Sequence, residues 1–159
     1  MNTMHPEGYF ATPNESNGKA VLVLHAWWGL NDTIKAICER LADAGFVPFA
    51  PDLYHGKVAD TIDGAKALSS ELNAERASAE IADAVAFLQA RTGGTDQRIA
   101  VIGFSMGAYF ALELSVHAAE QIHSVVVFYG AGPTDFGGSQ ASYLGHFAET
   151  DPYEPQEYV

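Results

Sequence analysis

The stretch IAVIGFSMGAYFAL, residues 99–112, changes abruptly from the pattern of a buried strand to the pattern of a buried helix. Ser105 stands at the change, with Gly103 two positions before it and Gly107 two positions after it. A serine at a sharp strand-to-helix turn needs such small neighbours, because the helix packs closely on the strand while the hydroxyl is pushed outward. The stretch therefore predicts a tight turn that presents Ser105 as a nucleophile.

Strands and helices alternate on both sides of this turn. Strand patterns occupy residues 8–13, 20–26, 46–54, 98–103, 124–130 and, more weakly, 142–146, and helical patterns occupy residues 32–44, 56–73, 74–91 and 106–119. Asp32 is the predicted cap of the first helix. Alternating strands and helices predict an α/β fold with a mostly parallel sheet and helices on both faces, and solid apolar runs predict strands that are covered on both faces. In such sheets ligands bind beyond the carboxyl ends of the strands.

The composition is that of an ordinary soluble globular protein. A length of 159 residues predicts a single domain over residues 1–159. Apolar residues make up 48% and charged residues 18%, which argues against a disordered chain. The net charge of −12 would repel phosphate backbones, so we expect no binding to nucleic acid.

The cysteine content and the N-terminus indicate a cytoplasmic protein. Cys38, the one cysteine, cannot form an internal disulfide, which favours a reducing compartment. It shares a helical stripe with Ile34 and Leu41, so we expect a core residue and not a reactive thiol. The start MNTMHPEGYF lacks the pattern of a signal peptide, and no apolar run approaches the ~20 residues that span a bilayer. We therefore expect no membrane association.

Two backbone amides are candidates for stabilising negative charge beside Ser105. The amide of Met106 lies at the predicted N-terminus of a helix, where N–H groups point at developing charge. The amide of Trp27 lies in the loop after a neighbouring strand. The rings of Trp27 and Trp28 could equally cover the edge of the core, which is compatible with a catalytic amide. No spacing of His or Cys residues supports a metal site, and we expect no cofactor.

Five sequence blocks together resemble the dienelactone hydrolase family of α/β hydrolases. The blocks follow one another in the order and approximate spacing of that family: HAWWGLND (25–32), PDLYHG (51–56), IGFSMGA (102–108), VVVFYG (125–130) and FAETDPYEP (147–155). The resemblance runs from about Gly8 to Tyr153. It implies a parallel-sheet hydrolase in which a triad of nucleophile, histidine and aspartate acts on esters or lactones.

The resemblance also implies a role for individual residues. Ser105 is the nucleophile, Asp151 is the acid, and the amides of Trp27 and Met106 form the oxyanion hole. The order of serine before aspartate is the order expected of this fold. Residues at the strand ends are the expected walls of a pocket for a small ester or lactone substrate: His25, Trp28, Tyr54, His55 and Tyr129.

Two positions depart from the best-known members of the family. Those members carry a cysteine at the position of Ser105 and a glutamate, which interacts with the resting thiol, at the position of Ala26. Losing both groups together is coherent, because a serine hydroxyl needs a base and not a partner that controls a thiolate. The two departures favour a general serine carboxylesterase over a strict dienelactone hydrolase.

The third departure from the family concerns the residue that would accept the proton of Ser105. In the family the catalytic histidine follows the acid, beyond a further helix and strand, whereas this chain ends eight residues after Asp151. We therefore expect a C-terminally incomplete hydrolase, without the last strand, the base and the last helix. The alternatives are that His25, His55 or His146 substitutes as base, or that the protein is a non-catalytic binding or scaffold protein. The sequence leaves the oligomeric state open.

Overall fold

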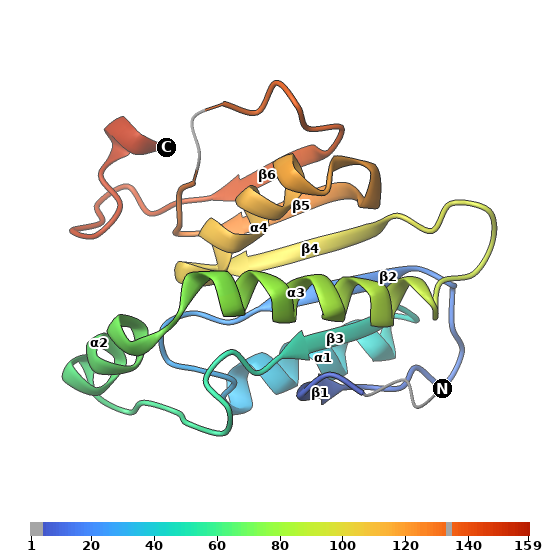
Figure 1. Ribbon diagram of the computed structural model, residues 1–159, viewed down its shortest axis with the longest axis horizontal. Helices are drawn as coiled ribbons and strands as arrows, with labels where there is room; N and C mark the ends of the chain where they lie inside the picture. The colour runs from blue at the N-terminus through green and yellow to red at the C-terminus, as the bar shows by residue number, and fades with distance from the viewer. Residues whose placement is uncertain (1–4, 133–134) are drawn as a thin grey trace.

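The computed structural model describes residues 5–132 and 135–159, and over these residues it holds one six-stranded sheet (Figure 1). The sheet has the order β1-β3-β2-β4-β5-β6. β1 is antiparallel to β3, and every other neighbouring pair is parallel. Residues 1–4, part of the stretch without a signal pattern, lie outside the described residues. The strands are β1 (Gly8–Phe10), β2 (Ala20–Leu24), β3 (Val47–Pro51), β4 (Ile99–Phe104), β5 (Ile122–Phe128) and β6 (Ser142–His146).

The α-helices are α1 (Asp32–Asp43), α2 (Ile62–Glu71), α3 (Ala74–Gln89) and α4 (Met106–His117), with short 3-10 helices at Ala119–Gln121 and Gln156–Tyr158. Three of the four α-helices that the structure describes, α1 to α3, begin at a polar side chain that caps them. The prediction that Asp32 caps α1 is wrong by one residue. The Asn31 side chain accepts a hydrogen bond from the Ile34 amide at 3.2 Å, and Asp32 adds negative charge to the first turn. No helix in the described ranges is long and apolar enough to cross a bilayer.

The core has two layers, one on each face of the sheet. Figure 1 shows α3 and α4 in front of the sheet and α1 behind it. Side chains alternate along β2, so that Leu22 and Leu24 belong to the core under α3 and α4, whereas Val21 and Val23 belong to the core under α1. The predicted α/β fold, with helices on both faces of a mostly parallel sheet, is confirmed.

One face of the sheet is only partly covered. β4 and β5 are half-buried at the residues that point away from α4, among them Ile102 and Phe128. Every residue of β6 is exposed. The expectation that β4 and β5 are covered on both faces is therefore wrong in this chain. The physical reason is that α1 packs against β3 and β1, at the other end of the sheet.

Cys38 lies in the core under α1 and is fully buried. Burial, and secondarily the charge of Glu39, raises the pKa of this thiol to about 12. We therefore predict that the native protein does not react with a thiol reagent at mildly alkaline pH, whereas the urea-unfolded protein reacts with one equivalent. A colourimetric thiol assay, with and without urea, checks this; rapid labelling of the folded protein would contradict the observed packing.

Candidate active site

Ser105 occupies a strained turn between β4 and α4. Its φ of 50° and ψ of −111° are rare for a residue with a side chain, and α4 begins at the next residue. Such a conformation costs of order 1–3 kcal/mol and persists only where the surrounding structure enforces it. The Ser105 amide donates to the Phe128 carbonyl at 2.9 Å, and the Ser105 carbonyl accepts from the Ala108 amide at 2.9 Å. The predicted strand-to-helix turn is therefore present.

Three glycines make this turn possible by leaving room for backbone. A Cβ on Gly103 would lie 2.4 Å from the Gly107 carbonyl oxygen, and a Cβ on Gly107 would lie 2.2 Å from the Leu24 carbonyl oxygen. A Cβ on Gly130 would lie 2.4 Å from the Ser105 carbonyl oxygen. The motif identifies the first two; the sequence signal for Gly130 is its place directly after an apolar strand. The turn thus contacts both the end of β2 and the loop after β5.

The loop after β2 lies against the first turn of α4. The Gly29 amide donates to the Ala26 carbonyl at 3.1 Å, which closes a tight turn around Trp27 and Trp28. The His25 carbonyl oxygen lies 2.7 Å from where a Cβ of Gly107 would stand. Within the described part of the chain, neither the Trp27 amide nor the Met106 amide donates to a protein acceptor.

His25 does not face a ligand. Its side chain is fully buried, and both ring nitrogens have partners: Nδ1 lies 2.7 Å from the Ala26 carbonyl oxygen, and the Leu53 amide donates to Nε2 at 3.2 Å. Burial lowers the pKa of His25, so the ring stays neutral. This placement corrects the expectation that His25 lines the substrate pocket, and it leaves no nitrogen to accept a proton from Ser105.

Tyr54 and His55 lie in the loop after β3 and are held by other residues. Tyr54 is buried, its hydroxyl lies 3.5 Å from the Met106 sulfur, and burial raises its pKa to about 12. His55 lies between two carboxylates, with Nδ1 2.7 Å from Glu7 and Nε2 3.1 Å from Glu80. Tyr54 therefore supports the start of α4, while His55 ties its loop to the N-terminal segment and α3.

A cavity of about 330 Å³ opens beside the serine turn. Its walls include Trp28 and Tyr129, two residues of the predicted substrate pocket, and Phe104, the residue before Ser105, whereas Ser105 itself does not line it. Ala26, the position where the family resemblance implies a glutamate, contributes to its wall. The cavity is therefore mainly aromatic and apolar, the usual character of a site for a small organic molecule.

Asp151 lies in the C-terminal tail, close to the loop after β2. Its Oδ1 accepts hydrogen bonds from the Tyr153 amide at 2.8 Å and the Glu154 amide at 3.2 Å. The Tyr153 ring meets the Trp27 ring edge-on, with centroids 5.7 Å apart. The tail thus folds back onto the loop that follows β2, and the carboxylate organises a turn of its own chain.

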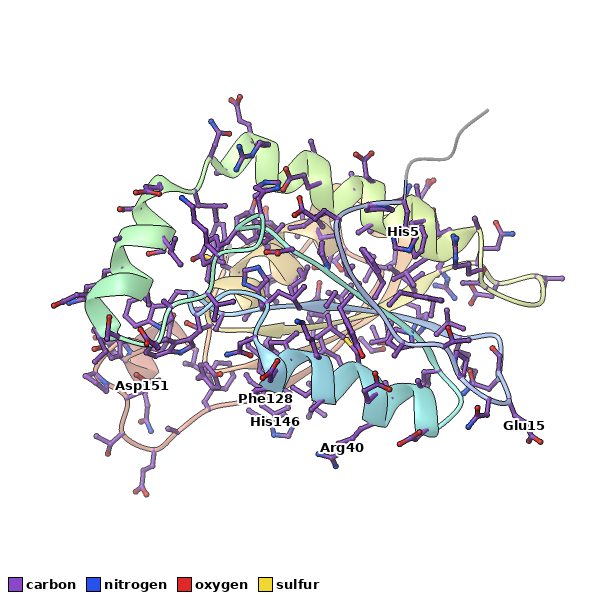
Figure 2. All side chains as sticks on the ribbon, turned by 90° about the horizontal axis from the view of Figure 1, so that it is seen from below. His5, Glu15, Arg40, Phe128, His146 and Asp151 are labelled. Atoms are coloured by element: carbon purple, nitrogen blue, oxygen red, sulfur yellow. The ribbon has the colours of Figure 1, made fainter. Side chains whose placement is uncertain are left out.

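The remaining candidate base, His146, is engaged elsewhere. Its ring stacks on Phe128 at 4.6 Å between centroids, and Phe128 stacks on Phe104 at 4.9 Å. In Figure 2 Asp151 lies toward the α2 end of the molecule, away from His146 and Phe128. Among the residues that the structure describes, no histidine ring forms a hydrogen bond to Ser105 or to Asp151. Within the described ranges, Ser105 therefore has no histidine partner.

Sequence comparison finds relatives that are longer than this chain. The sequence model of the dienelactone hydrolase family matches residues 7–159. A protein of Aquifex aeolicus (strain VF5), named "Putative carboxymethylenebutenolidase", is 36% identical over 135 residues, which cover 81% of this chain and 58% of that protein. The chain thus spans less than two thirds of the length of this curated relative.

Solved structures agree with the sequence comparison. The structure named m3DLH is 28% identical, with a TM-score of 0.78 over 95% of this chain and 66% of that chain. A dienelactone hydrolase-like promiscuous phosphotriesterase from metagenomic libraries is 26% identical, with a TM-score of 0.73 over 93% of this chain and 62% of that one. The fold is that of the α/β hydrolases, and the chain belongs to the dienelactone hydrolase family.

Proposed function

We propose that the protein is a serine hydrolase that cleaves carboxylic esters or lactones through an acyl-enzyme on Ser105. The observation that carries the proposal is the strained conformation of Ser105, enforced by glycines that contact backbone on both sides. Strain of this kind clusters at functional sites. The names of the relatives, which refer to hydrolases of lactones and phosphotriesters, support the same reaction class.

The proposed reaction uses the strand ends together. The Ser105 oxygen attacks the carbonyl carbon of the substrate, and the base takes the hydroxyl proton as the new C–O bond forms. The amides of Trp27 and Met106 donate to the oxygen that becomes negative. The intermediate collapses, the alcohol leaves with the proton from the base, and water then releases the acid from Ser105 by the same steps in reverse.

The proposed base is a histidine that follows Val159 in the complete gene product, oriented by Asp151. The greater length of the relatives supports this proposal. So does the exposed side of β6, which borders an apolar groove of about 800 Å³. A further strand and helix of the same chain would cover that groove and bring a turn near Asp151. The groove is lined mainly by apolar side chains and backbone, among them Tyr109, Leu112, Phe136, Tyr143, Leu144 and Phe147.

The proposed substrates are uncharged esters with an apolar acyl or aryl group. The cavity beside the turn has Trp28, Phe104 and Tyr129 in its walls, and Ala26 where a carboxylate stands in the best-known relatives. No lysine or arginine lines this cavity within the described residues. An aromatic ester therefore suits it better than a substrate with a free carboxylate.

A second candidate function is a binding or scaffold protein that has lost the chemistry. The observation that favours it is the engagement of His25, His55 and His146 with partners other than Ser105. Without a base, only the contributions of the oxyanion hole and of binding would remain. This candidate predicts a folded protein that binds small apolar molecules and turns over none.

Covalent labelling separates the two candidates. We expect a fluorophosphonate probe to label the complete gene product at Ser105, and an aryl ester of a short acid to be hydrolysed, because a base-activated serine attacks both. Peptide mass spectrometry identifies the labelled residue. Absence of both labelling and turnover in a protein that unfolds cooperatively would reject the hydrolase proposal and leave the scaffold candidate.

A further inference from the structure

His25, the buried histidine just before the loop that follows β2, takes no part in the reaction proposed above. We propose that His25 is a positioning residue that orients the peptide between Ala26 and Trp27 so that the Trp27 amide faces the serine turn. The proposal rests on the proposed function, since it assigns a role within the oxyanion hole of that hydrolase. It concerns a residue that touches neither substrate nor Ser105.

The geometry of one peptide group carries the inference. The Ala26 carbonyl and the Trp27 amide belong to the same planar trans peptide, so their C=O and N–H bonds point in opposite directions. His25 Nδ1 lies 2.7 Å from the Ala26 oxygen and holds that oxygen toward the interior. Because the peptide is rigid, the Trp27 N–H is turned away from the interior. The carbonyls of Leu24 and His25, just before this peptide, lie against Gly107 in the first turn of α4, so we place the Trp27 N–H on the side of the loop that faces Ser105.

A second contact determines which nitrogen of His25 carries the proton. The Leu53 amide can only donate, so Nε2 must accept and has no proton, which leaves the proton on Nδ1. Nδ1–H therefore donates to the Ala26 carbonyl. The neighbours of the ring are the Tyr54 ring, at 5.1 Å between centroids, and the more distant charge of Asp52. Burial lowers the pKa of His25 more than the Ala26 hydrogen bond and the charge of Asp52 raise it, so Nε2 stays unprotonated and keeps accepting from the Leu53 amide.

The Ala26 carbonyl accepts from two donors at once, His25 Nδ1 and the Gly29 amide. Hydrogen bonds to a carbonyl polarise the whole peptide group and strengthen its N–H as a donor. The same arrangement thus orients the Trp27 amide and increases its strength. A merely structural histidine could bond any backbone group, whereas this one bonds the peptide whose other end is the candidate oxyanion donor.

Two substitutions divide the contacts of His25 between them. In His25→Asn the side-chain amide nitrogen stands where Nδ1 stood and can still donate to Ala26, but the Leu53 amide loses its acceptor. In His25→Gln the terminal oxygen reaches the place of Nε2 and can accept from Leu53, but the Ala26 carbonyl loses its side-chain donor. Each variant therefore loses one of the two hydrogen bonds of His25 and keeps the other.

The test compares the aryl esterase kinetics of wild type and both variants, made in the complete gene product. We expect His25→Gln to lower kcat about 10- to 100-fold at nearly unchanged KM, since a misdirected oxyanion donor weakens only the transition state. His25→Asn should keep kcat within about threefold, because loss of the Leu53 contact does not turn the Trp27 amide. Affinity for a boronic acid that forms a tetrahedral adduct on Ser105 should fall with kcat in the glutamine variant alone.

Three results would overturn the inference while wild type remains active: equal kcat in the two variants, activity that follows urea stability alone, or a loss confined to KM. NMR of the ring nitrogens in wild type provides a test that needs no variant to fold, and a proton on Nε2 of His25 would also overturn it. An inactive, unlabelled wild type would instead reject the proposed function, and this inference with it.

Discussion

Replacing Gly107 with alanine is expected to lower the free energy of unfolding by about 3 kcal/mol or to prevent folding, the upper end of the cost of overpacking. The new Cβ would lie 2.2 Å from the Leu24 oxygen, 2.6 Å from the Leu24 carbon and 2.7 Å from the His25 oxygen. All three atoms are backbone of a central strand and its loop, so no side chain can move aside. Urea unfolding followed by circular dichroism measures the loss.

Gly138→Ala is the matched control for Gly107→Ala. A Cβ on Gly138 would meet only the Val116 side chain at 3.9 Å and its carbonyl oxygen at 4.0 Å, which are ordinary contacts. We expect stability within about 0.5 kcal/mol of wild type for this surface change. If Gly107→Ala were as stable as Gly138→Ala, the close packing of α4 on the end of β2 would be wrong, and the serine turn with it.

Removing the hydroxyl of Ser105 should produce the largest change in activity. Ser105→Ala is expected to lower kcat for an aryl ester by about 10⁴-fold or more in the complete gene product, as loss of the nucleophile does in other serine hydrolases. Fluorophosphonate labelling should disappear with it. Urea stability should stay close to wild type, because the Ser105 side chain forms no hydrogen bond to any residue that the structure describes, and alanine suffers the same backbone strain.

Ser70→Ala is a suitable control for the Ser105 substitution. Ser70 is an exposed residue of α2, and its hydroxyl bonds only the Ala67 carbonyl one turn earlier. We expect its kinetics and its labelling to equal those of wild type. Labelling that persists in Ser105→Ala would place the reactive group elsewhere and contradict the role of the turn.

Much of the fold was readable from local pattern. The strand-to-helix turn at Ser105 can be recognised in the sequence because its geometry leaves no room for side chains at Gly103 and Gly107, so both positions must be glycine. The apolar run of β2 and the amphipathic pattern of α3 are likewise local consequences of burial. Five blocks in the right order were then enough to indicate the family that the comparisons show.

The surroundings of the site were harder to predict, since they depend on contacts between distant segments. His25 looks like a pocket residue because it follows a strand, yet the Leu53 amide, 28 positions away, accounts for one ring nitrogen and the buried Ala26 carbonyl for the other. The rings of Phe104 and Phe128 stack because β4 and β5 pair in register. No local sequence pattern predicts that Phe104 lines a pocket or that Phe104 and Phe128 stack.

The same division holds for the catalytic proposal. The proposed nucleophile can be chosen from the sequence, because a strained turn of this kind needs glycine two positions before and two positions after the serine. The proposed direction of the Trp27 amide depends on tertiary structure, because the His25 ring that contacts the Ala26 carbonyl is held in one tautomer by the distant Leu53 amide. Steric exclusion between neighbouring residues restricts the residue types at nearby positions, so it can be read from the sequence. Hydrogen bonds between distant segments form only once the sheet has brought those segments together, so the sequence alone does not reveal them.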